Sequence, residues 1–249
     1  MNSDPTPVMV GLDPTMTGGV RTYLSARTTP IRMVIFDCDG VLIDSEALCD
    51  RVVSACITEL GWTIAPEECH LRFLGLSFHD MVPMIEARIG RSLGPGWVDR
   101  VVQRLTAILA TGVEPIQGAH QALTGITALG LPWRIASNSS HTEMAAKFAC
   151  VGWSDLVRDR VHSAHEIILR GGRGKPAPDV FLEAAAAENI DPAHCVVIED
   201  SVAGATAARE AGMACLGFSA DHDGAALRAV GAIPFRPMHA LPELLKGVS

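Results

Sequence analysis

The chain has 249 residues, of which 48% are hydrophobic and 19% are charged. This composition is too apolar for an intrinsically disordered protein, and the length suits one large domain or a core with a smaller inserted domain. The 20 basic residues against 28 acidic ones give a net charge of −8, without any basic run. We therefore expect neither a nucleic acid nor an anionic membrane as a partner.

Residues 1–30 contain several prolines and no apolar stretch typical of a secretory signal. We predict a disordered tail here, and Met33, just before the first strong strand, is an alternative start of the protein. The seven cysteines are odd in number, include no C-x-x-C pair and lie mostly in apolar stretches, which indicates free thiols in a reducing cytoplasm. No apolar run approaches the ~18 residues of a membrane span.

From residue 32 onward, short β-branched apolar runs alternate with longer helical stretches, a pattern typical of βαβ units in a parallel sheet. Runs such as 195–198 are continuously hydrophobic, as expected of strands that helices cover on both faces. The predicted fold class is α/β, a Rossmann-like parallel sheet core with an inserted all-helical cap domain. The predicted strands are residues 33–37, 133–137, 160–163, 195–199, 214–218 and 232–235.

About 95 residues separate the first two predicted strands, whereas a crossover with one helix needs about a dozen or more. Residues 47–113 in this gap show helical periodicity and no convincing strand, which predicts a cap of about four helices. The catalytic core would then comprise residues 31–46 and 114–249. Pro115 and Gly118 mark the loop where the chain returns from the cap.

The first predicted strand ends in Asp37-Cys38-Asp39-Gly40-Val41. Two carboxylates at this spacing can present a side chain and a backbone carbonyl to a hard cation, in the crevice where open α/β sheets bind ligands. A calcium loop or a plain acidic turn is the alternative. A helix-loop-helix calcium loop has its glycine at position 6, whereas Gly40 stands at position 4 after a strand.

Polar residues also follow other strands. Ser137 and Asn138 precede a helix and suit either an anion site or an ordinary N-cap. Lys175 stands before two closely spaced prolines, which either aim its ammonium or leave it a solvated loop lysine. Glu199 and Asp200 form a second acidic pair, for which helix capping is the competing explanation.

These strand ends lie along one edge of a parallel sheet. A charge of up to −4 would meet there, from Asp37, Asp39, Glu199 and Asp200. Such a cleft needs a cation, and Mg²⁺ together with Lys175 would also neutralise phosphoryl oxygens. The pattern predicts a phosphoryl-transfer site in which a carboxylate attacks phosphorus.

At these motifs the sequence resembles the haloacid dehalogenase superfamily, specifically its β-phosphoglucomutase-like branch of phosphatases and phosphomutases with a helical cap after the first motif. The match covers roughly residues 33–218, with four motifs in the family's order. The resemblance implies that Asp37 attacks the phosphate ester to form an aspartyl-phosphate. Asp39 would protonate the leaving alcohol and then deprotonate the attacking water.

The resemblance also implies the ligands of the metal and of the phosphate. Mg²⁺ would be held by the Asp37 side chain, the Asp39 carbonyl and Asp200, with Glu199 bound directly or through water. Lys175 would pair with Asp37 and contact the phosphoryl group. The other phosphate-binding residues would be Gly40, Val41, Ser137 and Asn138.

Two departures from family patterns narrow the chemistry. True haloacid dehalogenases lack an acid at the position of Asp39, so phosphate esters are favoured. Phosphonate-cleaving relatives use a cap lysine, and residues 47–113 contain none. A phospho-accepting receiver module, a hypothesis from another class, would be about half this length and would have no cap.

In the cap, the resemblance places the substrate-reading segment at residues 73–79. The candidate residues are Ser77 and His79 in this segment and Arg72 directly before it. His79 could equally be a surface helix residue. Sugar phosphomutases carry an arginine directly after the serine, where this chain has Phe78. The leading interpretation is therefore a Mg²⁺-dependent phosphatase of a small phosphorylated metabolite, a sugar phosphate or a sugar-acid phosphate. The alternative is a sugar phosphomutase.

Overall fold

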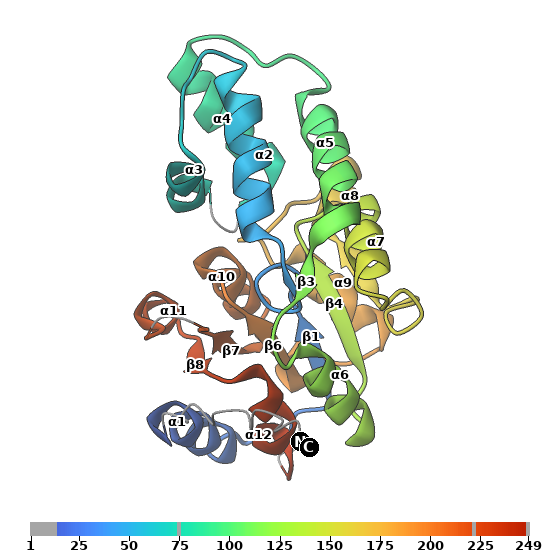
Figure 1. Ribbon diagram of the computed structural model, residues 1–249. Helices are drawn as coiled ribbons and strands as arrows, with labels where there is room; N and C mark the ends of the chain where they lie inside the picture. The colour runs from blue at the N-terminus through green and yellow to red at the C-terminus, as the bar shows by residue number, and fades with distance from the viewer. Residues whose placement is uncertain (1–13, 74–75, 221–222, 248–249) are drawn as a thin grey trace, which may run out of the picture.

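The computed structural model describes residues 14–73, 76–220 and 223–247, in which an α/β core carries a helical cap (Figure 1). The core is a six-stranded sheet whose neighbouring strands all pair in parallel. The predicted fold class is thus confirmed. In spatial order the strands are β5 (Val161–Ser163), β4 (Trp133–Ser137), β1 (Met33–Phe36), β6 (Cys195–Glu199), β7 (Ala214–Phe218) and β8 (Ile233–Phe235).

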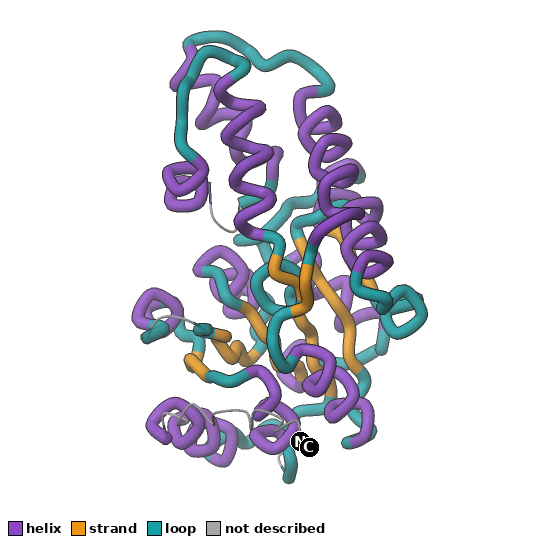
Figure 2. Tube along the Cα trace, viewed as in Figure 1, coloured by secondary structure: helices purple, strands orange, loops and turns teal. Residues whose placement is uncertain are grey.

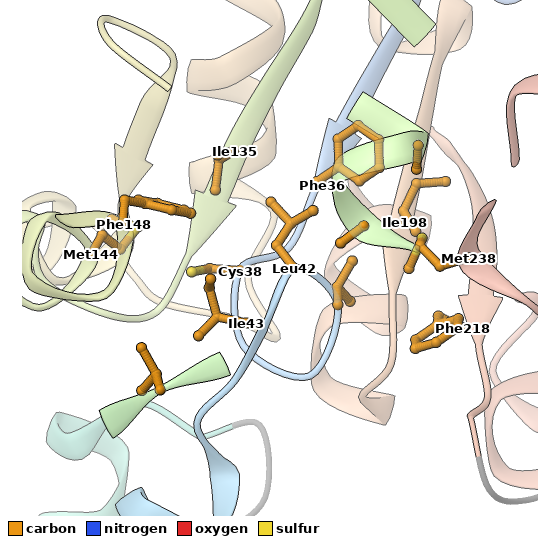
Figure 3. Close-up of a cluster of buried hydrophobic side chains, with 14 of the residues drawn as sticks. Phe36, Cys38, Leu42, Ile43, Ile135, Met144, Phe148, Ile198, Phe218 and Met238 are labelled. Atoms are coloured by element: carbon orange, nitrogen blue, oxygen red, sulfur yellow. The ribbon is translucent and has the colours of Figure 1, made fainter. Parts of the chain in front are cut away.

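Strand β1 lies inside the sheet and is buried on both faces. Val34 and Phe36 belong to one hydrophobic cluster and Met33 and Ile35 to another, because successive side chains of a strand point to opposite faces. Figure 3 shows part of the first cluster, which includes the side chains of Phe36 from β1 and Ile198 from β6. Burial on both faces explains why this strand contains no polar residue.

Helices cover both faces of the sheet (Figure 2). Helices α8, α9 and α10 supply the cluster around Met33, whereas α6, α7 and α12 supply the cluster around Val34. None of the helices in the described ranges combines the length and the apolar character of a bilayer span. The core helices are α6 (Ala119–Ala128), α7 (His141–Cys150), α8 (Ala164–Leu169), α9 (Asp179–Ala187), α10 (Val202–Glu210), α11 (Ala225–Ala229) and α12 (Leu241–Leu245), with 3₁₀ turns at Pro192–His194 and Met238–Ala240.

The cap lies beyond the carboxyl edge of the sheet, at the top of Figure 1. Helix α2 packs against α3 and α5, and α5 also packs against α7 of the core. The chain enters and leaves the cap through an antiparallel ribbon of β2 (Ile43–Asp44) and β3 (Glu114–Pro115). Sequence analysis did not predict this ribbon, because two-residue strands carry no measurable alternation. The cap helices are α2 (Glu46–Thr58), α3 (Pro66–Phe73), α4 (Phe78–Ile89) and α5 (Trp97–Gly112).

A helix, α1 (Pro14–Ser25), occupies part of the segment predicted to be disordered. Its side chains Val20 and Leu24, four residues apart on one face, are buried where α1 packs against β8 and α12. The prediction of disorder for residues 1–30 is therefore wrong for residues 14–25, and residues 1–13 lie outside the described part of the chain. A protein that began at Met33 would lack α1, and the surface of β8 and α12 against which α1 packs would be uncovered.

Candidate active site

Three neighbouring strands bring polar side chains to one edge of the sheet. Asp37 directly follows β1, Ser137 ends β4 and Glu199 ends β6. Because β1 lies between β4 and β6, the carboxyl ends of these parallel strands meet. A cavity between this edge and the cap is lined on the core side by residues that include Asp37, Asp39, Ser137, Asn138, Ser139, Lys175, Glu199 and Asp200.

Lys175 joins two buried carboxylates in this cavity. Its Nζ lies 2.6 Å from Asp37 Oδ1 and 2.7 Å from Glu199 Oε1. Burial raises the pKa of Asp37 to about 7, even though the ammonium of Lys175 opposes this shift. Burial also lowers the pKa of Lys175, but the two carboxylates outweigh it and hold that pKa above its ordinary value. The ammonium is therefore charged at neutral pH, whereas full ionisation of Asp37 requires further positive charge.

A metal ion could bring that positive charge, and Asp37, Glu199 and Asp200 form a possible binding site for one. One carboxylate oxygen from each lies within 4.8 Å of the others. Burial and the neighbouring carboxylates raise the pKa of Asp200 well above its ordinary value. Gly40 adopts a φ of +73°, and a Cβ there would collide with the Asp200 carboxylate. An all-oxygen donor set, buried at Asp37 and Glu199 and half-buried at Asp200, fits Mg²⁺ because it is in need of positive charge.

Asp39 is held by residues that sequence analysis did not predict. Lys147 Nζ lies 2.6 Å from Asp39 Oδ1 and 2.9 Å from Ser139 Oγ. Ser139 Oγ donates to Asp39 Oδ2 at 3.0 Å, and Ser45 Oγ also donates to this carboxylate. The predicted Ser137 adds a third hydroxyl donor, at 3.3 Å from Asp39 Oδ2. Burial raises the pKa of Asp39, but the ammonium of Lys147 and the hydrogen bonds to the carboxylate outweigh burial and bring that pKa below its ordinary value. Asp39 is therefore an ionised carboxylate restrained by Lys147 and three hydroxyl groups.

Lys147 is fully buried on α7, on the same face as Met144 and Phe148. A lysine within the apolar stripe of an amphipathic helix is the sequence signal that could have identified it, because a buried ammonium needs an anionic partner. The sequence does not reveal which carboxylate that partner is, since Asp39 stands 108 residues earlier in the chain.

The predicted phosphate-binding residues fall into two groups. Ser137 and Asn138 line the cavity, and Asn138 Oδ1 accepts the backbone N–H of Lys175 at 3.0 Å, which ties two loops of the site together. Gly40 and Val41 are not among the lining residues. The N–H of Gly40 donates to the carbonyl of residue 43 at 2.9 Å, and the Val41 side chain is buried in the core. Val41 can therefore meet a phosphate only through its backbone.

The structure brings one of the three predicted cap residues to the cavity. Ser77 lines it, as does the neighbouring Phe78, and the Ser77 hydroxyl also caps α4. Arg72 lies outside the lining and forms an exposed ion pair of 2.7 Å with Glu68. His79 also lies outside the lining, where its ring contacts another histidine ring.

The cap instead contributes three polar residues that sequence analysis missed. Glu46 and Asp50 lie one turn apart at the start of α2, and His70 lies on α3. His70 Nδ1 is 3.0 Å from Asp50 Oδ2. Two acidic residues at i and i+4, directly after the motif that begins at Asp37, were the available signal, because that spacing places both on one face of a helix.

Comparisons with known proteins agree with this geometry. The family model for haloacid dehalogenase-like hydrolases matches residues 31–212. The chain is 31% identical to 6-phosphogluconate phosphatase of Escherichia coli K12 over 87% of its own length and 95% of that protein. It is 32% identical to hexitol phosphatase B of the same strain, over 74% of this chain and 81% of that protein.

A solved structure extends the agreement to three dimensions. A hydrolase of the same family from Deinococcus radiodurans R1, crystallised with bound phosphate and sodium, superposes with a TM-score of 0.65 at 31% identity. The superposition covers 88% of this chain and 99% of that one. The convergence of acidic strand ends on a buried lysine beneath a helical cap, and a family match across most of the core, lead to one conclusion: the chain belongs to the haloacid dehalogenase-like hydrolases and is an enzyme.

Proposed function

We propose that the protein is a Mg²⁺-dependent phosphatase that hydrolyses a small phosphorylated metabolite, a sugar phosphate or a sugar-acid phosphate. The observation that carries this proposal is the contact of 2.6 Å between Asp37 and Lys175, with an ionised carboxylate, Asp39, two residues along the same turn. A nucleophile and a proton carrier on opposite sides of one ester oxygen require this spacing. The names of two relatives, a 6-phosphogluconate phosphatase and a hexitol phosphatase, support the choice of ester.

In the first step, an oxygen of Asp37 forms a bond to phosphorus while the bond from phosphorus to the alcohol oxygen breaks, which gives an aspartyl-phosphate. Asp39 donates a proton to the departing alcohol. Because Lys147 holds Asp39 ionised in the free enzyme, Asp39 must first take up a proton as the negative phosphoryl group enters the cavity. In the second step, Asp39 removes a proton from water, whose oxygen attacks phosphorus and releases Asp37.

The other core residues hold the charges that these steps require. Lys175 contacts the phosphoryl oxygens and keeps Asp37 in place. Ser137, Asn138 and the backbone N–H of Val41 contact the same phosphoryl group. The metal would be held by the side chains of Asp37 and Asp200, by the carbonyl of Asp39 and by Glu199. When bound, Mg²⁺ neutralises the phosphoryl oxygens and the acidic group beneath them.

The cap favours a phosphatase over the alternative, a sugar phosphomutase. A mutase needs a cation for the second phosphate of a bisphosphate, and Phe78 lines the cavity at the place where mutases carry an arginine. Arg72 is engaged with Glu68 outside the lining. The cavity measures about 140 Å³, which suits a small metabolite rather than a phosphoprotein. The seven unpaired cysteines fit the proposed cytoplasmic location.

The test is phosphate release from a panel of sugar phosphates, sugar-acid phosphates and phosphoglycolate, with Mg²⁺ and with a chelator. A coupled assay for isomerisation of β-glucose 1-phosphate runs beside it. Chelator-sensitive release by the wild type, abolished in Asp37→Asn with the fold retained, is the expected result. Isomerisation without net phosphate release would show instead that the protein is a mutase, and near-normal turnover by Asp37→Asn would refute the assigned nucleophile.

A further inference from the structure

The active-site cavity contains few positive charges, and its lysine is already engaged. Among the described residues that line the cavity, Lys175 is the only lysine and no arginine is present. Its ammonium contacts Asp37 and Glu199 at the phosphoryl end of the cavity. His70 is the remaining group that can carry a positive charge. Positive charge for a phosphoryl group is therefore available at the core side of the cavity, from Lys175.

The opposite, cap-facing side of the cavity carries negative charge. Asp50 lines it from α2, and His70 of α3 lies against Asp50, whereas Glu46, one turn earlier on α2, lies toward Asp200 and the core. The Asp50–His70 pair is at most neutral, and Glu46, whose carboxyl lies beside Asp200 toward the core, brings no cation. Asp50, His70 and Glu46 also line a second, adjacent hollow whose other lining includes Asp44 and Glu67. The field at this end therefore repels anions.

The remaining lining residues of the cap are mostly apolar, including Val53, Phe73, Leu76, Phe78 and Met81. Such a surface packs against carbon and leaves the His70–Asp50 pair and a serine hydroxyl to bind substrate hydroxyl groups. None of these groups compensates the desolvation of a carboxylate or of a second phosphate.

Basic side chains near the cavity are held elsewhere. Arg72 pairs with Glu68, and Lys147 is buried against Asp39. Arg51 is exposed and lines only the adjacent hollow, where carboxylates outnumber it. Residues 74 and 75, the part of the cap segment outside the described ranges, are leucine and glycine and bring no charge.

We propose that the enzyme selects phosphomonoesters of uncharged polyols and rejects esters whose alcohol carries a second anionic group. This inference rests on the proposed phosphatase function and narrows its substrate class to the neutral members. A second anion at the far end of the alcohol would stand against Asp50 without an unpaired cation. Lys175 at the core end therefore stabilises a single phosphoryl group, whereas Asp50 at the cap end acts against a doubly anionic substrate.

The matched probes are sorbitol 6-phosphate and 6-phosphogluconate, six-carbon chains that differ at C1, a hydroxymethyl group in one and a carboxylate in the other. We expect kcat/KM at least tenfold higher for sorbitol 6-phosphate with the Mg²⁺-loaded wild type. Equal or better hydrolysis of 6-phosphogluconate would overturn the inference while leaving the phosphatase proposal intact. Hydrolysis of p-nitrophenyl phosphate reports the proposed function separately, and loss of all three activities would refute that function together with this inference.

A variant locates the source of the selectivity. Asp50→Asn keeps the shape of the side chain and its contact with His70 but removes a negative charge from the cavity. It should reduce the preference for sorbitol 6-phosphate at least threefold, with each rate referred to p-nitrophenyl phosphate. Asp99→Asn, an exposed acid of the cap outside the cavity lining, is the matched control and should leave the ratio unchanged. An unaltered ratio in Asp50→Asn would contradict the proposed electrostatic origin.

Discussion

Replacement of Lys147 by methionine should destabilise the protein by about 3 kcal/mol, through the loss of one ion pair. The Nζ of Lys147 and Oδ1 of Asp39 are 2.6 Å apart, so their attraction is roughly 6 kcal/mol at an effective dielectric constant of about 20. Breaking a buried pair typically costs about 3–5 kcal/mol. We expect the low end of that range, because the Asp39 side chain is 26% exposed and keeps three hydroxyl donors.

The assay is urea unfolding of a double-mutant cycle with Asp39→Asn. In the Asp39→Asn background Lys147 is a buried ammonium without its carboxylate, so Lys147→Met should cost almost nothing there. The coupling free energy between the two positions should then be about 2–3 kcal/mol. Equal costs of Lys147→Met in both backgrounds, within about 0.5 kcal/mol, would refute the inference that Lys147 acts through Asp39.

Three further predictions concern the same site. Asp39→Ala should slow hydrolysis of an alkyl phosphate by at least ~10² but spare p-nitrophenyl phosphate, whose leaving group needs no proton; equal losses in steady-state rates would contradict the acid role. The pKa of Asp37 is about 7 in the folded metal-free protein against an ordinary value of 3.8, so its contribution to stability is complete below pH 4 and is lost as the pH rises through 7. Thermal unfolding should therefore show a larger stabilisation by Mg²⁺ at pH 8 than at pH 5.5, and the reverse order would be inconsistent with a buried metal site at Asp37. Gly40→Ala should raise the Mg²⁺ concentration for half-maximal rate about tenfold, because the new methyl group displaces the Asp200 carboxylate. An unchanged concentration would argue against that contact.

The strands and the cap were predictable because they follow from local patterns. The continuous apolar run of β1, the alanine-rich helices and the helical periodicity of residues 47–113 each repeat within a few turns, and the structure contains the corresponding elements. Asp37, Ser137 and Glu199 were identifiable because strand ends of a parallel sheet lie at one edge. The helix α1 escaped prediction because its stability comes from a surface formed by β8 and α12, more than 200 residues away.

Sequence by itself determined the α/β class and the inserted cap, and it predicted the core residues around Asp37, since each of these depends on residue type at short spacing. Only the tertiary structure decided that Lys147 restrains Asp39, that Arg72 and His79 lie outside the cavity, and that Glu46 and Asp50 line it. The physical reason is that electrostatic partnership depends on distance in space, and a separation of 2.6 Å across 108 residues of chain leaves no trace in local periodicity.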